Sequence, residues 1–156
     1  MIASMVKKII GTNPAAGIQA YAGDISAWQA WDMLTDDGAA VLVDVRTLAE
    51  WQFVGRPDLA KLGKTVTLVP WVDYPDMARN PNFIADVEVT GAGREAPILL
   101  LCRSGQRSAH AAMALTVAGF SACYNIIDGF EGHHDAHGHR GANHGWKALD
   151  LPWIQD

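Results

Sequence analysis

Residues 97–118 read PILLLCRSGQRSAHAAMALTVA, and this stretch decides the fold. Its first six residues are apolar apart from the thiol, and the run has the length expected of a strand buried on both faces, as in a parallel sheet. Good helix formers begin near Gln106 and continue to Gly119, where a helix would stop. A short polar loop joins the two parts, so the stretch predicts a strand–loop–helix unit of an α/β domain.

The same alternation continues on both sides of this stretch. Short apolar runs predict further strands, and apolar residues at helical spacing behind the capping residues Asp24 and Ser26 predict a helix. The expected strands span 40–45, 65–69 and 122–127, and the other expected helices span 27–34 and 81–89. We therefore predict an α/β domain with a mostly parallel central sheet flanked by helices on both faces. Residues 18–156 would form this single domain, and residues 1–17 an N-terminal arm.

The composition excludes several classes of protein. With 156 residues, of which 49% are hydrophobic and 19% charged, the chain suits one folded domain and is unlike a disordered one. Its net charge of −5 argues against a nucleic-acid partner, and its longest apolar runs are far shorter than the roughly 20 residues of a membrane span. Two cysteines are too few for a disulfide scaffold. Because the N-terminus also lacks the pattern of a secretory leader, these features predict a cytoplasmic protein with no membrane contact.

The chemistry is predicted to lie where the strand gives way to the helix. Cys102 ends the buried strand, and ligands of open α/β sheets bind beyond the carboxyl ends of their strands. The following loop would aim backbone N–H groups into a cradle at a helix N-terminus, and Arg103 and Arg107 add positive charge. A helix terminus alone stabilises an anion by about 0.3–1 kcal/mol, so the loop N–H groups and an arginine are needed to ionise a thiol. Cys102 is therefore a candidate nucleophile, although cysteine is also common as a small buried hydrophobe.

This loop resembles the active-site loop of the rhodanese family of sulfurtransferases. Residues 102–108 read CRSGQRS, against the family pattern C-x-x-G-x-R/K-S/T. Residues 42–46, LVDVR, followed by Glu50 and Trp51, resemble the family's first motif, and residues 125–132, NIIDGFEG, resemble its closing segment.

The resemblance covers about residues 18–153 and extends to the tail. GWK at 145–147 and LPW at 151–153 are similar to the tail of single-domain bacterial members. The chain departs from the family at 55–58, where GRPD replaces G-H-I-P-G-A, so the connection across 53–66 is not predicted. The resemblance implies the rhodanese-like fold.

It also implies a sulfurtransferase of the thiosulfate:acceptor type that works without a cofactor or a metal. The Cys102 thiolate would attack the outer sulfur of a small anionic donor such as thiosulfate, and the Cys102 persulfide would then pass this sulfur to cyanide or a thiol. Arg107 and Arg103 would hold the anionic end of the donor. The site implied in this way consists of the catalytic Cys102 and the substrate-binding residues Arg103, Ser104, Gly105, Gln106, Arg107 and Ser108.

Two alternative functions stay open. A sulfur-carrier or binding module would deliver the persulfide to a sulfur-accepting protein partner. A cysteine-loop phosphatase or arsenate reductase is disfavoured, because only four residues separate Cys102 from Arg107, one fewer than in the tyrosine phosphatase signature.

Four features outside the loop have competing interpretations. Arg46 would either line the pocket or form a structural ion pair with Asp44, and Trp71 would form a wall of the active site. The five histidines of residues 133–144 are interpreted as part of a polar loop, because a zinc site needs three or four converging ligands. Cys123 would either resolve the persulfide as a disulfide or be a buried strand residue.

Overall fold

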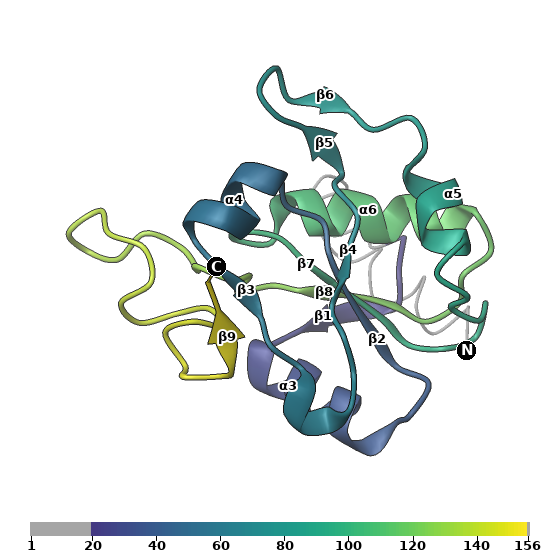
Figure 1. The fold of residues 1–156 in the computed structure, drawn as a ribbon, viewed down its shortest axis with the longest axis horizontal. Helices are drawn as coiled ribbons and strands as arrows, with labels where there is room; N and C mark the ends of the chain where they lie inside the picture. Colours follow the sequence, from purple (N-terminus) through teal and green to yellow (C-terminus); the bar gives the residue numbers. More distant parts are fainter. Residues whose placement is uncertain (1–19, 156) are drawn as a thin grey trace, which may run out of the picture.

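A five-stranded parallel sheet forms the centre of the computed structural model, which describes residues 20–155 (Figure 1). The strands lie in the order β1-β8-β7-β2-β4. Their bounds are Gly23–Ile25 (β1), Val41–Asp44 (β2), Thr67–Leu68 (β4), Ile98–Leu101 (β7) and Cys123–Ile126 (β8). All pairings in this sheet are parallel, with Asp44 opposite Leu101 and Leu100 opposite Asn125. The carboxyl ends of β2, β7 and β8 therefore meet at one edge, where open α/β sheets bind their ligands.

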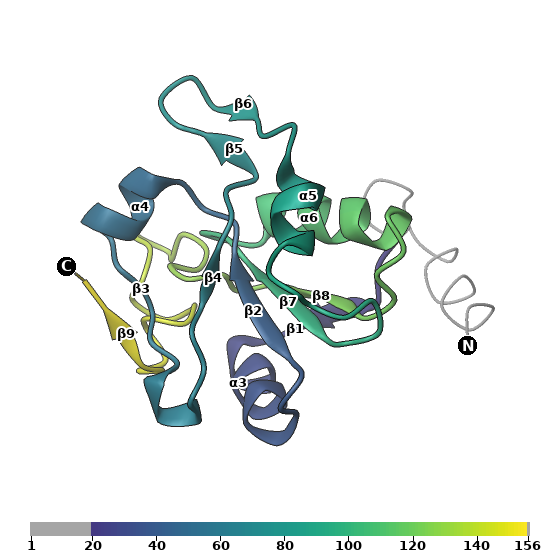
Figure 2. The same ribbon diagram turned by 45° about the vertical axis from the view of Figure 1, so that its right-hand side comes forward.

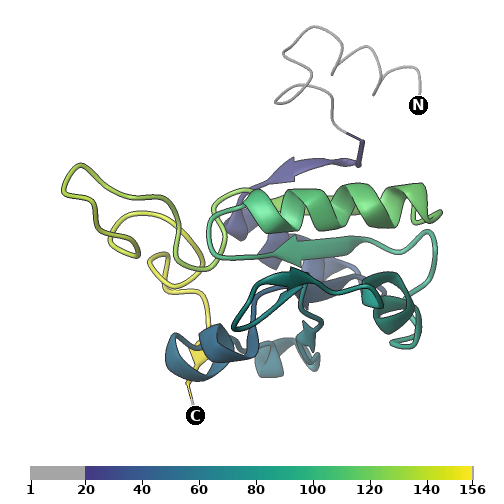
Figure 3. The ribbon, with the colours of Figure 1, turned by 90° about the horizontal axis from the view of Figure 1, so that it is seen from above.

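Helices cover both faces of the sheet, which confirms the predicted fold class. The 10-residue helix α3 (Ala27–Asp36) packs on one face, and α5 (Phe83–Glu88) and α6 (Gln106–Val117) pack on the other. Figures 2 and 3 show α3 and α6 on opposite sides of the strands. Leu99 and Leu101 belong to the cluster under α3, whereas Ile98 and Leu100 belong to the cluster under α6. This alternation is the two-residue period of a strand that is buried on both faces.

The structure has an element at each predicted strand and helix, with shorter bounds at several. The strand expected over 65–69 is reduced to β4, and the helix expected over 81–89 is reduced to α5. Ser26 begins α3 as predicted, because its side chain accepts a hydrogen bond from the Gln29 N–H in a capping box. The predicted N-terminal arm, residues 1–17, lies outside the described residues.

Several short elements had no counterpart in the sequence prediction. They are the strand β1 of the main sheet, α4 (Leu48–Phe53), the 3-10 turn η1 (Ala60–Leu62), and the strands β3 (Arg56–Pro57), β5 (Val72–Asp73), β6 (Ala78–Arg79) and β9 (Trp153–Ile154). β3 and β9 pair antiparallel, so the segment that follows α4 is tied to the end of the chain. β5 and β6 form an antiparallel hairpin that projects beyond the main sheet (Figure 2). Within residues 20–155, no helix is long and apolar enough to cross a membrane.

Candidate active site

Cys102 is the first residue after β7, and its sulfur points into the loop that leads to α6. The Gly105 N–H donates a hydrogen bond to Cys102 Sγ over 3.0 Å, and Ser108 Oγ lies 3.1 Å from the same sulfur. The residue is 1% exposed. Its sulfur is thus covered by the loop, but the contacts it makes there are polar. A backbone N–H that donates to a sulfur at a helix start is a group that stabilises a thiolate.

Two glycines allow the loop to close around this sulfur. Gly105 precedes α6 with φ +99°, and a Cβ at this position would lie 2.5 Å from the Ile127 carbonyl oxygen. Gly129 has φ +67°, and a Cβ there would collide with the Arg103 carbonyl. Left-handed backbone conformation and close approach both require glycine at such positions.

The segment after β8 fixes the loop from the other side. The Phe130 N–H donates to the Cys102 carbonyl over 2.8 Å, and the Glu131 and Gly132 N–H groups donate to the Arg103 carbonyl over 3.0 and 3.1 Å. The loop backbone is therefore held by hydrogen bonds from a segment more than 20 residues later in the sequence. After these hydrogen-bonded residues, the chain extends away from the sheet in the long loop at the end of the domain (Figure 3).

Arg107 forms a two-pronged ion pair with Glu50 of α4. Arg107 Nη1 and Nη2 donate to the two carboxylate oxygens over 2.7 and 2.9 Å, and the side chains are 21% and 18% exposed. Burial alone would raise the pKa of Glu50, but hydrogen bonds and charge from Arg107 hold this pKa below its ordinary value. Burial would likewise lower the pKa of Arg107, but Glu50 raises it, and the charge of Cys102 acts in the same direction. Much of the positive charge of Arg107 is therefore already balanced within the protein.

A chain of buried polar side chains lies behind the sulfur. The Ser108 hydroxyl donates to Asn125 Oδ1 over 2.5 Å, and Asn125 Nδ2 donates to Asp24 Oδ1 over 3.1 Å and to the Gly105 carbonyl over 3.2 Å. The Tyr21 hydroxyl donates to Asp24 Oδ1 over 2.7 Å. Ser108 and Asn125 are 0% and 3% exposed. This chain links Cys102 to the strands β8 and β1.

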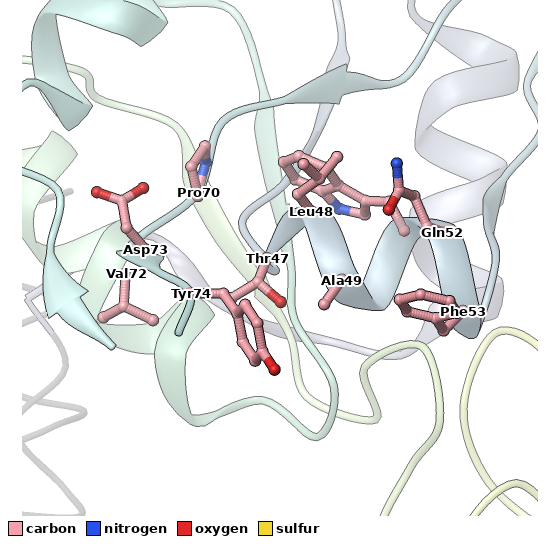
Figure 4. Close-up of a pocket in the computed structure, with 10 residues that line it drawn as sticks. Thr47, Leu48, Ala49, Gln52, Phe53, Pro70, Val72, Asp73 and Tyr74 are labelled. Carbon is pink, nitrogen blue, oxygen red and sulfur yellow. The ribbon is translucent and has the colours of Figure 1, made fainter. Parts of the chain in front are cut away.

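Two neighbouring pockets lie beside the loop. One, of about 480 Å³, is lined by Arg103, Arg107 and Glu131 together with residues of α4 and with Tyr74 and Met77. The other, of about 350 Å³, lies between α4 and the segment 70–74, and Figure 4 shows Tyr74 between these two walls. Both are lined by Thr47, Ala49 and Tyr74, whereas Cys102 lines neither. The larger pocket brings the two loop arginines to a surface that an anion could reach.

Comparison with known proteins gives the family of the chain. The family model of the STR4 middle domain matches residues 22–156. The chain belongs to the STR4 middle-domain family.

Relatives of the chain occur in bacteria and plants. An uncharacterized protein of Rickettsia conorii is 41% identical over 130 residues, which cover 83% of this chain and 95% of the relative. Rhodanese-like domain-containing protein 4 of Arabidopsis thaliana, a chloroplastic protein, is 28% identical over 131 residues, which cover 83% of this chain and 25% of the plant protein. The named distant relatives are thus rhodanese-like proteins.

Solved structures show the same fold. The crystal structure of Rv0390 from M. tuberculosis matches with a TM-score of 0.80 and 53% identity, over 87% of this chain and 99% of that protein. The solution structure of a polysulfide-sulfur transferase homodimer from Wolinella succinogenes matches with a TM-score of 0.61 over 97% of this chain and 93% of the other. Its identity of 21% makes this a similarity of fold. The rhodanese-like fold expected from the loop motif is therefore present.

The remaining predicted site residues differ in burial and in the contacts that they make. Ser104 is half-buried in the loop and Gln106 is exposed at the start of α6. Arg46 is 0% exposed, pairs with Asp44 over 2.7 Å and donates to the Gly55 carbonyl over 2.8 Å. It lines neither of the two pockets beside the loop, so its contacts are those of the structural ion pair.

Trp71 lines neither of these two pockets, although its neighbours Pro70 and Val72 line one of them. It is 8% exposed, packs edge-on against Phe83, and has the Arg79 guanidinium 3.5 Å from its ring centroid. These are the contacts of a core residue below the hairpin of β5 and β6.

Cys123 is too far from Cys102 to form a disulfide with it. The register places Cys123 opposite Ile98, four residues before Cys102 on the neighbouring strand. At about 3.3 Å per residue the separation is roughly 13 Å, whereas bridged cysteines have Cα atoms within about 7 Å. Burial raises the pKa of Cys123 to about 11. In the described part of the chain, no group of three or more histidine, cysteine or acidic side chains converges as a metal site would require, the histidines of 133–144 included.

Sequence reasoning did not assign a role to two residues of this site. Glu50 was noted only as part of a motif, and its distance of 57 residues from Arg107 hides the pairing. Asn125 carried a signal of its own, because it is a polar residue in a strand that is otherwise apolar on both sides.

Proposed function

We propose that this protein is a sulfurtransferase in which Cys102 carries a sulfane sulfur as a persulfide. The observation that carries the proposal is the Gly105 N–H, which donates to a cysteine sulfur at the carboxyl end of a parallel strand. A sulfur anion in this position is stabilised by the loop and by the start of α6. The rhodanese-like names of distant relatives support the same reaction type.

The first half of the reaction loads the enzyme. The Cys102 thiolate attacks the outer sulfur of thiosulfate, the new bond forms between the two sulfurs, and the sulfur–sulfur bond of the donor breaks. Sulfite leaves with the electron pair of that bond, and Cys102 becomes a persulfide anion. The negative charge moves from Sγ to the outer sulfur, which lies within reach of the same loop N–H groups.

The second half transfers the sulfur. A nucleophile such as cyanide attacks the outer sulfur, the bond to Cys102 Sγ breaks, and thiocyanate leaves while Cys102 returns to the thiolate. A thiol acceptor in its thiolate form reacts in the same way and leaves as a persulfide. Both halves use one covalent intermediate, so the kinetics are those of a ping-pong enzyme.

Arg103 is the cation best placed to hold the anionic donor. It is exposed and lines the larger pocket, whereas the charge of Arg107 is balanced by Glu50. The resemblance assigned this role to Arg107 first, because the family pattern has a basic residue at that position and leaves position 103 variable. In this proposal Arg107 holds α4 against the loop and shapes the pocket, and Arg103 contributes the charge that meets the donor.

Mass spectrometry after thiosulfate treatment tests the proposal. The protein should gain the mass of one sulfur atom, and reduction should remove it. Cys102→Ser should abolish the gain and the formation of thiocyanate from thiosulfate and cyanide. Cys123→Ser is the matched control, since Cys123 is buried in the sheet, and it should load normally. Equal loading of the Cys102→Ser variant, or release of phosphate from an aryl phosphate without thiocyanate formation, would refute the assignment.

A second candidate is delivery of the persulfide sulfur to a protein. The observation that favours it is a group of exposed apolar side chains beside the loop. Leu48 and Phe53 of α4 are 60% and 77% exposed, and Tyr74 and Met77 of the facing hairpin are 64% and 48% exposed. Figure 4 shows Leu48, Phe53 and Tyr74 at the pocket between α4 and the segment 70–74. Clustered exposed apolar side chains are typical of surfaces that meet another molecule. Transfer of label from the loaded protein to a thiol-bearing protein, faster than to cyanide, would identify this function.

A further inference from the structure

The Ser108 hydroxyl has one proton and two neighbours that could receive it. Asn125 Oδ1 lies 2.5 Å away and Cys102 Sγ lies 3.1 Å away. The orientation of the Asn125 amide is fixed, because its Nδ2 faces two acceptors, the Asp24 carboxylate and the Gly105 carbonyl. The amide therefore presents its oxygen to Ser108, and the hydroxyl donates to Asn125 in the resting arrangement.

This direction of donation has a consequence for Cys102. While the Ser108 proton points to Asn125, only a lone pair of Ser108 Oγ faces the sulfur. The thiol can donate its proton to that lone pair, whereas a thiolate would meet it with repulsion. When Cys102 loses its proton to water, the Ser108 hydroxyl must turn and donate to the sulfur, and Asn125 Oδ1 is left buried without its donor. A buried acceptor left without a donor is unfavourable, so this loss opposes the ionisation.

We propose that Asn125 is a positioning residue which directs the Ser108 hydroxyl and thereby sets the fraction of Cys102 that is present as thiolate. The proposal rests on the proposed role of Cys102 as the nucleophile. The hydroxyl has two positions: it points to Asn125 when Cys102 is a thiol, and to the sulfur when Cys102 is a thiolate. Asn125 favours the first position and so restrains ionisation of a buried nucleophile.

Other charged and titratable groups also lie close to Cys102 and Asn125. Arg107 of α6 acts on Cys102 by its charge and is itself balanced by Glu50 of α4. Asp44, at the end of β2, acts on Arg107 and is paired with Arg46. Asp24 and Tyr21 stand behind Asn125 on the β1 side. Arg107, Glu50, Asp44 and Arg46 do not contact Asn125, whereas Asp24 and the Gly105 carbonyl lose a donor when Asn125 is changed. A comparison of the same change with and without Ser108 subtracts that loss, because it occurs in both backgrounds.

The rate of alkylation of Cys102 as a function of pH tests the proposal. Asn125→Leu replaces the amide by an apolar group of similar shape, so Ser108 is free to donate to the sulfur. The midpoint of the alkylation profile should fall by about one pH unit, a tenfold larger thiolate fraction at low pH. In a Ser108→Ala background the same Asn125→Leu change should move the midpoint little, because Asn125 acts through the hydroxyl. An unchanged or higher midpoint in Asn125→Leu, or an equal fall without Ser108, would overturn the proposal.

A second measurement avoids a buried substitution in the strand. The S–H stretching band of Cys102 in the infrared spectrum, identified by its loss in Cys102→Ser, reports whether the thiol donates a hydrogen bond. Ser108→Ala removes the acceptor and keeps a good helix former, so this band should move to higher frequency. An unmoved band would show that the thiol does not donate to Ser108 and would refute the proposal. The alkylation midpoint and the S–H band can both be measured without sulfur transfer. Failure of the wild-type protein to load sulfur would refute the proposed function, whereas the changes in midpoint and band frequency test the role of Asn125.

Discussion

Arg107 and Glu50 join α6 to α4 beside the larger of the two pockets, although 57 residues separate them in the sequence. Arg107 stands in the first turn of α6, and Glu50 stands in the first turn of α4, where it also accepts from the Thr47 N–H as part of a capping box. The Glu50 carboxylate thus caps the start of α4 and also binds Arg107. The position of α4 and the position of the loop are therefore not independent.

Arg107→Ala should destabilise the fold as well as reduce sulfur transfer. The substitution leaves the half-buried Glu50 carboxylate without its partner, which we expect to lower the free energy of unfolding by about 1–3 kcal/mol. Arg103→Ala is the matched control, because Arg103 is exposed and its loss should raise the KM for thiosulfate about tenfold with unchanged stability. Urea unfolding and steady-state kinetics of the two variants would separate these effects. Unchanged stability of Arg107→Ala would show that the ion pair contributes nothing to the fold.

The same ion pair predicts a dependence of stability on pH. The pKa of Glu50 in the folded protein lies below its ordinary value of 4.5, so Glu50 contributes stability that is fully present above that value. This contribution is lost as the pH falls through the lower, folded pKa. The difference in unfolding free energy between the wild-type protein and Glu50→Gln should thus be constant from pH 7 to about pH 5 and shrink in more acidic solution. A difference that grows on acidification would contradict the assigned direction.

Gly105→Ala should disrupt the cradle of the sulfur. A Cβ at Gly105 would lie 2.5 Å from the backbone oxygen of Ile127, and the φ of +99° is unfavourable for alanine. Moving the loop away from Ile127 would withdraw the N–H that donates to Cys102, and we expect a loss of sulfur loading together with about 1–3 kcal/mol of stability. Gly38→Ala is the control, since a Cβ there would meet nothing within 4 Å. Loading at the wild-type rate in Gly105→Ala would remove this N–H from the mechanism.

The central part of the fold could be predicted because its signals are local. In residues 97–118 one apolar run, one glycine and one series of helix formers follow each other, and the structure has β7, the loop and α6 there. The capping box of α4, Thr47 with Glu50, is also a local signal, but the helix has only six residues and lacks an apolar period long enough to indicate it. β3 and β9 are two residues each, and only their pairing across the domain makes them strands.

The partners of the site residues depend on contacts that no local pattern contains. Cys102 and Gly105 lie three residues apart, so the cradle could be predicted from the loop. Asn125 reaches Asp24 across 101 residues of sequence, and Arg107 reaches Glu50 across 57. Asp24 and Asn125 meet because they are partners in the register of β1 and β8. Arg107 and Glu50 meet because α6 and α4 follow the carboxyl ends of the neighbouring strands β7 and β2. The sequence therefore indicated the reactive group, whereas the groups that direct it required the fold.

Tyr74→Ala should discriminate between small and aromatic acceptors. Tyr74 is 64% exposed and lines both pockets beside the loop, where it faces α4 (Figure 4). An aromatic thiol such as 4-mercaptobenzoate would pack its ring against this side chain, whereas cyanide is too small to do so. Loss of one aromatic contact of about 1 kcal/mol should raise the KM for the aromatic thiol about fivefold, with unchanged turnover of cyanide. Trp28→Ala removes an aromatic ring that is 50% exposed on α3, on the other face of the sheet, and should change neither constant. If Tyr74→Ala slowed both acceptors equally, the pocket would act on the loop itself and not on the choice of acceptor.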